Sequence, residues 1–186
     1  MLVKLRKVRL SYPNLFTATS FQGEGDKSYS ASFIFPKNHP DVKEVEAALL
    51  AAAKEKWGDK GAATLKELKG KDRVCLHDGD NKSESDGYAG NFYISARRRE
   101  KDRAPTVLDG DKTPLTVKDG KPYGGCIVNG HIEIYAQDNA FGKRINATLL
   151  GVQFAGHGEP FSGSAPAATD AFEVEETDDS DLDGLV

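Results

Sequence analysis

The sequence predicts a mainly β protein: a small antiparallel β-barrel of about five strands, with one main helix after the second strand and long loops. Two observations lead to this fold class. Several segments alternate apolar and polar residues with the period of a strand, whereas a single long segment has the 3.6-residue period of a helix. Parallel neighbours each need a long crossover, usually helical, so one main helix favours antiparallel pairing.

The N-terminal segment MLVKLRKVRLSY predicts a first strand that contains a bulge. Val3 and Leu5 share one face, and the apolar pattern resumes out of phase at Val8 and Leu10. An extra residue near Lys7 would produce this slip. The PNLF stretch that follows predicts a turn, because Pro and Asn favour turn conformations.

Residues 28–36, SYSASFIFP, predict a second strand after a flexible hairpin loop at residues 21–27. One face would carry Tyr29, Ala31, Phe33 and Phe35. Residues 38–58 then predict the main helix, with Pro40 near its first position and Gly58 at its end. A shorter helix is expected over residues 62–70.

The rest of the body has strand chemistry. Residues 105–125 form an excursion punctuated by Gly, Pro and Asp, and the remaining strands are expected at residues 74–77, 87–99, 125–137 and 144–156. Strands of this number and spacing fit an OB-fold-like barrel best.

The charge distribution divides the chain into a basic body and an acidic end. Eight of the 29 acidic residues and none of the 25 basic residues lie at or after Gly163, so residues 1–162 carry a formal net charge of +4 while the whole chain carries −4. We therefore expect a folded domain over residues 1–162 and a flexible linker with an acidic tail over 163–186. Such asymmetry indicates a body that binds polyanions.

Targeting signals are not evident in the sequence. It contains no run of 18 apolar residues, and the N-terminus alternates bases with aliphatic residues instead of forming the apolar core of a signal peptide. We expect a cytoplasmic protein. Cys75 and Cys126 lie in apolar strand-like runs, which favours two buried free thiols over a disulfide or a metal pair.

Basic and aromatic residues interleave on two predicted strands. A strand face with cations and rings suits single-stranded nucleic acid, because phosphates attract Lys and Arg while unpaired bases stack on aromatic rings. The simpler alternative is a solvated sheet face with the rings in the barrel core. The candidate DNA-binding residues are Lys4, Arg6, Lys7, Arg9, Tyr12, Phe16, Tyr93, Arg97 and Arg99.

The sequence patterns for catalysis and metal binding are weaker than the pattern for nucleic-acid binding. Residues 77–87, HDGDNKSESDG, are rich in acids but lack the spacing of an EF-hand, so a flexible loop is favoured. The four histidines are not in HExxH spacing, and His131 is best explained as a structural or surface residue. We expect no cofactor and no metal. A metal-dependent nuclease would have to use His77, Asp78, Asp80 and Asp86.

The acidic tail has two interpretations. It could act as a solubilising extension, or it could imitate the polyanion and compete for the basic groove at high effective concentration. In the second case, tail residues released by DNA would contact partner proteins. The candidate partner-binding residues are Phe172, Glu173, Glu175, Glu176, Asp178, Asp179, Asp181 and Asp183.

Several stretches, in order, resemble a known family. VRLSYPNLF, SYSASFIFPK, GYAGNFYISAR, PYGGCIVNGHIEIYA and LLGVQFAGHGEPFSG, with DAFE after them, are similar to the OB-fold single-stranded DNA-binding proteins of tailed bacteriophages and prophages. The resemblance covers about residues 3–162 and extends to the linker and the acid-rich end. It implies a non-catalytic, metal-free accessory of replication or recombination that coats single strands. It also implies that the acidic tail contacts replication partners.

The leading hypothesis is therefore a non-enzymatic single-stranded DNA-binding protein with little sequence preference, in the host cytoplasm if it is phage-encoded. An architectural protein that prefers duplex DNA is the alternative, and a metal-dependent nuclease is a more distant one. Edge strands of such a barrel can pair between chains, so the sequence leaves both a monomer and a homodimer open.

Overall fold

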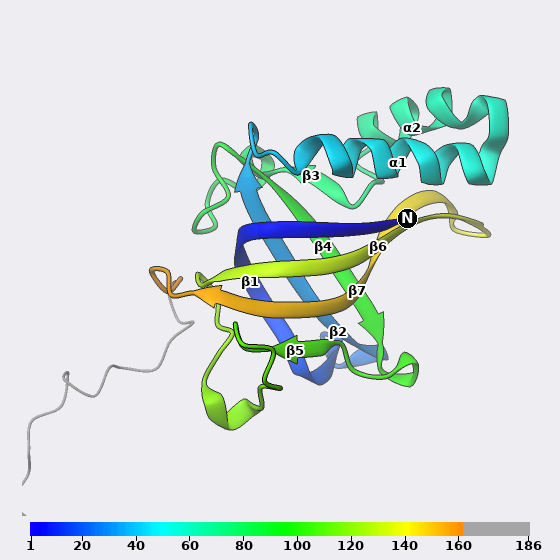
Figure 1. Ribbon diagram of the computed structural model, residues 1–186. Helices are drawn as coiled ribbons and strands as arrows, with labels where there is room; N and C mark the ends of the chain where they lie inside the picture. The colour runs from blue at the N-terminus through cyan, green and yellow to red at the C-terminus, as the bar shows by residue number, and fades with distance from the viewer. Residues whose placement is uncertain (162–186) are drawn as a thin grey trace, which may run out of the picture.

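The computed structural model describes residues 1–161, which form a β-barrel with two helices across one end (Figure 1). The predicted linker and acidic tail at residues 163–186 lie outside the described residues. The barrel consists of β1 (Leu2–Phe21), β2 (Glu24–Pro36), β4 (Asn91–Arg99), β6 (Ile127–Asn139) and β7 (Gly142–Gly156). The sheet order is β3-β4-β2-β1-β6-β7-β5, and an additional pairing of β4 with β7 closes the barrel.

The closing pair is parallel, with Arg97 opposite Thr148. The predicted antiparallel pairing is thus confirmed for the other four neighbours in the barrel and is wrong for this one. The reason lies in chain direction. Four antiparallel pairs link β4 to β7 through β2, β1 and β6, so β4 and β7 run in the same direction and can close the barrel only as a parallel pair. The result is a mixed five-stranded barrel with two short extra strands.

The long strand β1 bends at two irregular positions. Lys7 has a left-handed φ of 54°, and the pairing of β1 with β6 shifts between Leu5 and Val8. This confirms the predicted bulge. The predicted PNLF turn is wrong, since these residues lie inside β1. The pairing of β1 with β2 shifts between Ser11 and Asn14, so a second bulge accommodates Pro13, which has no amide hydrogen to donate to the ladder.

The apolar faces of the strands point into the barrel, as their alternation predicts. Ala31, Phe33 and Phe35 of β2 are buried, and Ile94 of β4 pairs with Phe33. The turn between β1 and β2 is shorter than the predicted loop, because β2 begins at Glu24. Both cysteines are buried and free, which confirms their prediction.

Two helices pack on one end of the barrel (Figure 1). They are α1 (Val42–Trp57) and α2 (Gly61–Gly70), joined by the single turn η1 (Gly58–Lys60). The predicted 3.6-residue period is confirmed, since Val45, Leu49 and Ala52 share one face and are buried against the strands. Helix α2 adds Leu65 and Leu68 to the same core. The helices therefore close one end of the barrel and leave its outer faces open.

The remaining elements are short. β3 (Leu76–Asp78) and η2 (Gly79–Lys82) precede β4, and η3 (Glu100–Asp102), β5 (Thr106–Leu108) and η4 (Val117–Asp119) follow it. β5 runs parallel to β7 at the edge of the sheet. Among residues 1–161, no helix is both long and apolar enough to span a membrane.

Candidate nucleic-acid interface

Short polar side chains cover the outer face where β1, β2 and β4 lie side by side. The ladder places Ser32 between Ser11 of β1 and Ser95 of β4, and the hydroxyls of Ser32 and Ser95 lie 3.4 Å apart. Asn14 donates a hydrogen bond of 3.2 Å to the Ser30 hydroxyl in the next row. We call this surface the serine face. Ser11 is buried under Tyr88, whose hydroxyl donates to it over 3.1 Å. The short side chains of Ser30, Ser32 and Ser95 are partly exposed, so a polymer can approach the sheet closely along them.

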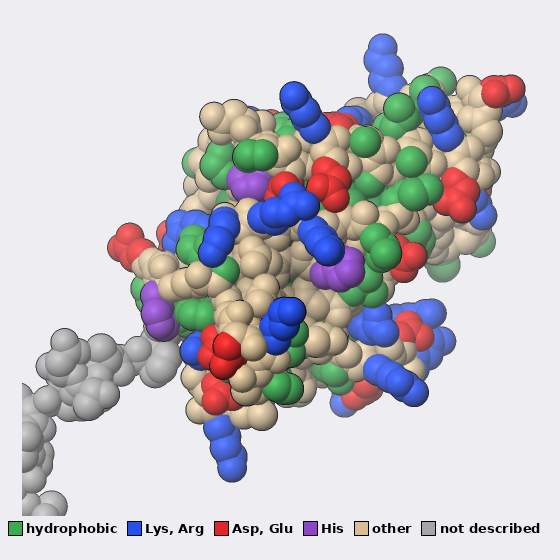
Figure 2. All heavy atoms as spheres, in the orientation of Figure 1, with side chains coloured by type: hydrophobic (Ala, Val, Ile, Leu, Met, Phe, Trp, Pro, Cys, Tyr) green, Lys and Arg blue, Asp and Glu red, His purple; other side chains and the backbone are tan. Residues whose placement is uncertain are grey.

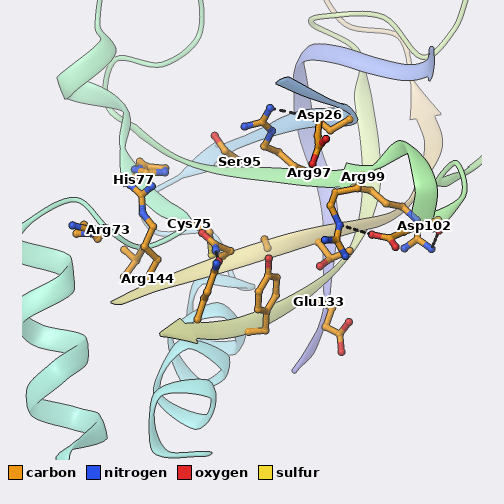
Figure 3. A pocket seen from close by; sticks show the side chains of 18 of the residues that line it. Asp26, Arg73, Cys75, His77, Ser95, Arg97, Arg99, Asp102, Glu133 and Arg144 are labelled. Atoms are coloured by element: carbon orange, nitrogen blue, oxygen red, sulfur yellow. Dashed lines mark hydrogen bonds and ion pairs between the residues drawn. The ribbon is translucent and has the colours of Figure 1, made fainter. Parts of the chain in front are cut away.

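A groove of about 890 Å³ continues the serine face across the closing pair of strands (Figure 3). We call it the arginine groove. Its lining comes from β4, from the start of β2, from the paired ends of β6 and β7, and from β3 with the segment before it. The arginines that line it are Arg73, Arg97, Arg98, Arg99 and Arg144, and the carboxylates are Asp26, Asp72, Asp102 and Glu133.

Two of the groove arginines are held by the turn after β4. Arg99 donates to the Asp102 carboxylate over 2.9 Å, which raises the pKa of Arg99 further. Arg98 donates to two backbone carbonyls of the same turn, those of Asp102 and Arg103. These contacts fix one end of the groove. The ion pair with Arg99 also neutralises the negative charge of Asp102.

The other three arginines keep their charge available. Arg97 donates to the Ser28 hydroxyl over 3.2 Å, and Arg73 donates to the backbone oxygen of Phe141 over 2.8 Å. Within residues 1–161, neither of these side chains nor Arg144 forms an ion pair of the kind that holds Arg99 to Asp102. Arg73 and Arg144 lie near one another toward one end of the groove in Figure 3. Guanidinium groups in this arrangement suit phosphate, which they can bind in a bidentate manner.

An aromatic cluster lies beside the serine face, at the end away from Arg99. The Tyr88 ring is 4.9 Å from the Tyr93 ring and 6.4 Å from the Tyr12 ring, and His77 stacks on Tyr93 at 4.8 Å. Tyr12 is 59 % exposed and has a left-handed φ of 45°, which is rare for a bulky residue. The bulge in β1 thus turns this ring outward. Backbone strain of this kind is a reason to look for function.

A lysine lies over these rings. The Lys82 ammonium is 4.9 Å from the centroids of Tyr12 and Tyr88 and 5.8 Å from that of Tyr93. Burial raises the pKa of both Tyr88 and Tyr93, so both phenols stay neutral at physiological pH. Tyr88 is fully buried, so the rings that a base can reach are those of Tyr12 and Tyr93. With the Lys82 ammonium beside them, they supply the chemistry that base stacking and phosphate contact require.

The acidic loop before β4 holds Lys82 and Tyr88 in place. Lys37 donates to Asp78 and to Asp80 over 2.9 and 2.8 Å, and Asp80 also accepts from the backbone amide of Gly90. These bonds lower the pKa of Asp80. The segment is more structured than the predicted flexible loop. Its sequence contains the turn residues that suggested a loop, but the partner Lys37 follows β2 and is not visible locally.

The side chains considered for a metal-dependent nuclease do not converge. His77 pairs with Asp72 over 2.7 Å, and Asp78 and Asp80 are occupied by Lys37. In the part of the chain that the structure describes, no group of three His, Cys, Asp or Glu side chains is arranged to hold a metal ion. His131 lies on the outer face of β6, as its position in the alternation predicts.

The predicted basic residues of β1 are divided between two faces of the barrel. Arg6 is bound by the buried carboxylate of Asp41 at 2.5 Å and lies 3.5 Å from Glu44. Lys4 and Arg6 line a second groove of about 500 Å³ on the outside of β1, β6, β7 and β5. Lys7 is exposed at the bulge. Figure 2 shows this face, where basic side chains lie next to acidic ones.

Arg9 and Phe16 have structural contacts. Arg9 donates to the backbone oxygen of Glu159 over 2.8 Å and lies 4.3 Å from the centroid of the Phe161 ring. A Cβ atom at Gly87 would lie 2.8 Å from this ring, so the end of the described chain packs beside the aromatic cluster. Phe16 is half-buried and packs against the core. The structure thus brings Tyr12 and Tyr93 into one cluster and Arg97 and Arg99 into one groove.

Sequence reasoning missed several residues of this surface. Arg73, Arg144 and Tyr135 line the arginine groove, and Tyr88 and Lys82 complete the aromatic cluster. Tyr135 and Arg144 were detectable in principle, because each takes an outward position in the alternation of its strand. Arg73 lies in a connecting segment with no periodic pattern, so its place could not be predicted.

Comparison with protein families settles the family. The model of the family described as Enterobacter phage Enc34, ssDNA-binding protein, matches residues 1–182. The chain belongs to this family. It is also 42 % identical over 176 residues to putative protein p50 of Acyrthosiphon pisum secondary endosymbiont phage 1, covering 93 % of each chain. The resemblance to phage single-stranded DNA-binding proteins is thereby confirmed.

Solved structures agree with this assignment. The chain is similar to the Enc34 protein in complex with ssDNA, with a TM-score of 0.70 and 27 % identity over 86 % of this chain and 88 % of that one. The single-stranded DNA-binding protein gp2.5 of bacteriophage T7 has a TM-score of 0.56 at 14 % identity, over 96 % of this chain and 97 % of that one. The T7 similarity shows the fold alone. The predicted OB-fold-like barrel is confirmed.

Proposed function

We propose that this protein binds single-stranded DNA along the arginine groove, the serine face and the aromatic cluster. The observation that carries the proposal is membership of the Enc34 family, of which one protein has been solved in complex with ssDNA. The surface itself supports it with three uncommitted arginines, short serines and exposed or half-buried tyrosines.

The chemistry favours single strands over duplex DNA. Bases in a duplex are already stacked on one another, so their faces are not available to Tyr12 or Tyr93. A single strand offers both its phosphates and its base faces. Because contacts to phosphate and ring stacking are tolerant of sequence, we expect little sequence preference and a strong dependence on salt. The function is then non-catalytic coating of exposed strands during phage DNA replication or recombination in the host cytoplasm.

The acidic tail fits this function as a competitor. Phe161, the last described residue, packs on Arg9 and next to Gly87, so the described part of the chain ends beside the aromatic cluster. A tethered segment with eight acids reaches the groove at high effective concentration. DNA in the groove would leave the tail free for replication or recombination proteins, through the acids between Glu173 and Asp183 and the ring of Phe172.

The test is fluorescence anisotropy of a labelled oligo-dT strand, titrated with the full chain and with a chain ending at Ser162, at two salt concentrations. We expect binding that weakens with salt and tightens on truncation. An unlabelled duplex at equal nucleotide concentration should compete poorly. Absence of binding by both chains would reject the proposal, whereas stronger competition by duplex would replace it with the architectural alternative.

A further inference from the structure

The tip of the β6–β7 hairpin presents an uncovered aromatic ring. Phe141 is 86 % exposed and lies in the two-residue turn between Asn139 and Gly142, which form the last pair of the ladder. Figure 1 shows this hairpin as the yellow loop below α1 and α2. An exposed large apolar side chain at a turn, where small and polar residues are usual, calls for a function.

The backbone of this turn is held firmly while the ring stays uncovered. The amide of Phe141 donates to the Asn139 side chain over 2.9 Å, and its carbonyl accepts from Arg73 over 2.8 Å. One face of the hairpin is braced against the end of α1, because Trp57 donates to Asp138 over 3.1 Å and its ring lies 5.6 Å from the Lys143 ammonium. The position of Phe141 is therefore preorganised.

The other face of the hairpin is a wall of the arginine groove. Gln137 and Arg144 are paired across the two strands, and both line the groove with Arg73. Phe141 is three residues from Arg144, or about 10 Å along the hairpin. Arg73 joins the groove to the tip, because it lines the groove and its guanidinium donates to the Phe141 carbonyl. Cations thus lie on the groove side of the ring.

We propose that Phe141 stacks on one base of the single strand whose phosphates lie in the arginine groove. This inference rests on the proposed function and adds a second stacking position, at the opposite end of the groove from the turn that holds Arg99. The positive charge near the tip of the β6–β7 hairpin favours single-stranded DNA as the ligand. Arg73 and Arg144 attract phosphate, and every base has a flat face that a phenylalanine ring can contact without sequence preference.

The first test measures affinity for oligo-dT by anisotropy. Phe141→Ala should weaken binding about tenfold. Phe141→Tyr should bind as tightly as the wild type, because it keeps the aromatic ring on which a base stacks. Val117→Ala is the matched control, since Val117 is 69 % exposed on η4 and does not line the groove. Equal affinities of wild type and Phe141→Ala would overturn the inference and assign the ring to another partner.

The second test detects the stack directly. Phe141→Trp adds an indole at the tip, and saturating oligo-dT should quench this added emission, after subtraction of the Trp57 signal that the wild type provides. Val117→Trp should show no added quenching. Anisotropy recorded on the same samples separates the two proposals: binding without quenching contradicts the stack alone, whereas no binding by the wild type contradicts the proposed function.

Discussion

The arginine groove and the N-terminal half of β1 are both dense in basic residues, yet Arg97 and Arg144 of the groove are held differently from Arg6 of β1. In β1, Arg6 is bound to the buried carboxylate of Asp41, which also accepts from the Arg6 backbone amide over 2.7 Å. In the groove, Arg97 and Arg144 have no ion pair within residues 1–161. A run of basic residues is thus a poor measure of available charge. Whether a cation is available to a ligand depends on whether another element brings a carboxylate to it.

Removal of the groove cations should weaken binding the most. Arg97→Ala combined with Arg144→Ala should weaken oligo-dT binding about a hundredfold, because two charge-assisted hydrogen bonds to phosphate are each worth about 1.5 kcal/mol or more. The slope of log affinity against log salt should become shallower by about 0.7 for each phosphate that the variant no longer neutralises. Lys4→Ala combined with Lys7→Ala is the matched control on β1. An equal decrease in affinity in both double variants would erase the distinction between the two regions.

The aromatic cluster should give the next largest effect. Tyr12→Ala should weaken oligo-dT binding about tenfold without changing thermal stability, since the ring is 59 % exposed and a stacked base contributes about 1–3 kcal/mol. Tyr12→Phe keeps the ring and should bind as the wild type does. Unchanged binding by Tyr12→Ala, measured by the same anisotropy assay, would remove this residue from the interface.

The ion pair of β1 should matter for stability instead of binding. Asp41→Ala should lower the free energy of unfolding by about 2 kcal/mol, because it leaves the Arg6 backbone amide without its acceptor and removes the shorter ion pair of the Arg6 guanidinium. Thermal denaturation should show a decrease in Tm of about 4–8 °C. Affinity for oligo-dT should be unchanged. Tighter binding in this variant would mean that Arg6 contributes to the interface once it is released from Asp41.

The smallest effect concerns the thiol that lines the groove. Burial raises the pKa of Cys75 to about 12 and also raises the pKa of Cys126. Since the thiolate is the reactive form, both thiols should be inert to a disulfide reagent in the native protein at about pH 8 and should react after unfolding. Rapid labelling of the native chain would show that the groove opens far enough to expose Cys75.

The sequence predicted those parts of the fold and the site that depend on local alternation. The bulge at Lys7, the inward rings of β2 and the outward position of Arg97 all follow from period two along single strands. The parallel closure of β4 on β7 did not, because a register between distant strands leaves no local pattern. Arg73 and Arg144 join Arg97 only through that closure, so the groove could not be assembled from the sequence.

The same limit explains why the sequence predicted that the basic residues of β1 bind DNA. Arg6 and Asp41 are 35 residues apart, and the carboxylate reaches the strand only because α1 packs over the barrel end. From the sequence, Asp41 belongs to the first helical turn, where a carboxylate is expected to interact with the helix terminus, but its actual partner lies on β1. A contact between a helix and a strand of this separation is set by tertiary packing, which propensity does not encode.

The path of a bound strand distinguishes the two regions: it should follow the arginine groove and the aromatic cluster and not the N-terminal half of β1. Photocrosslinking of oligo-dT that contains 5-iodouracil, followed by mass spectrometry of the linked peptides, locates this path. We expect links to peptides that contain Tyr12, Tyr93, Tyr135 or Phe141. Links confined to His131 and the other residues of the second groove would contradict the assignment of the interface.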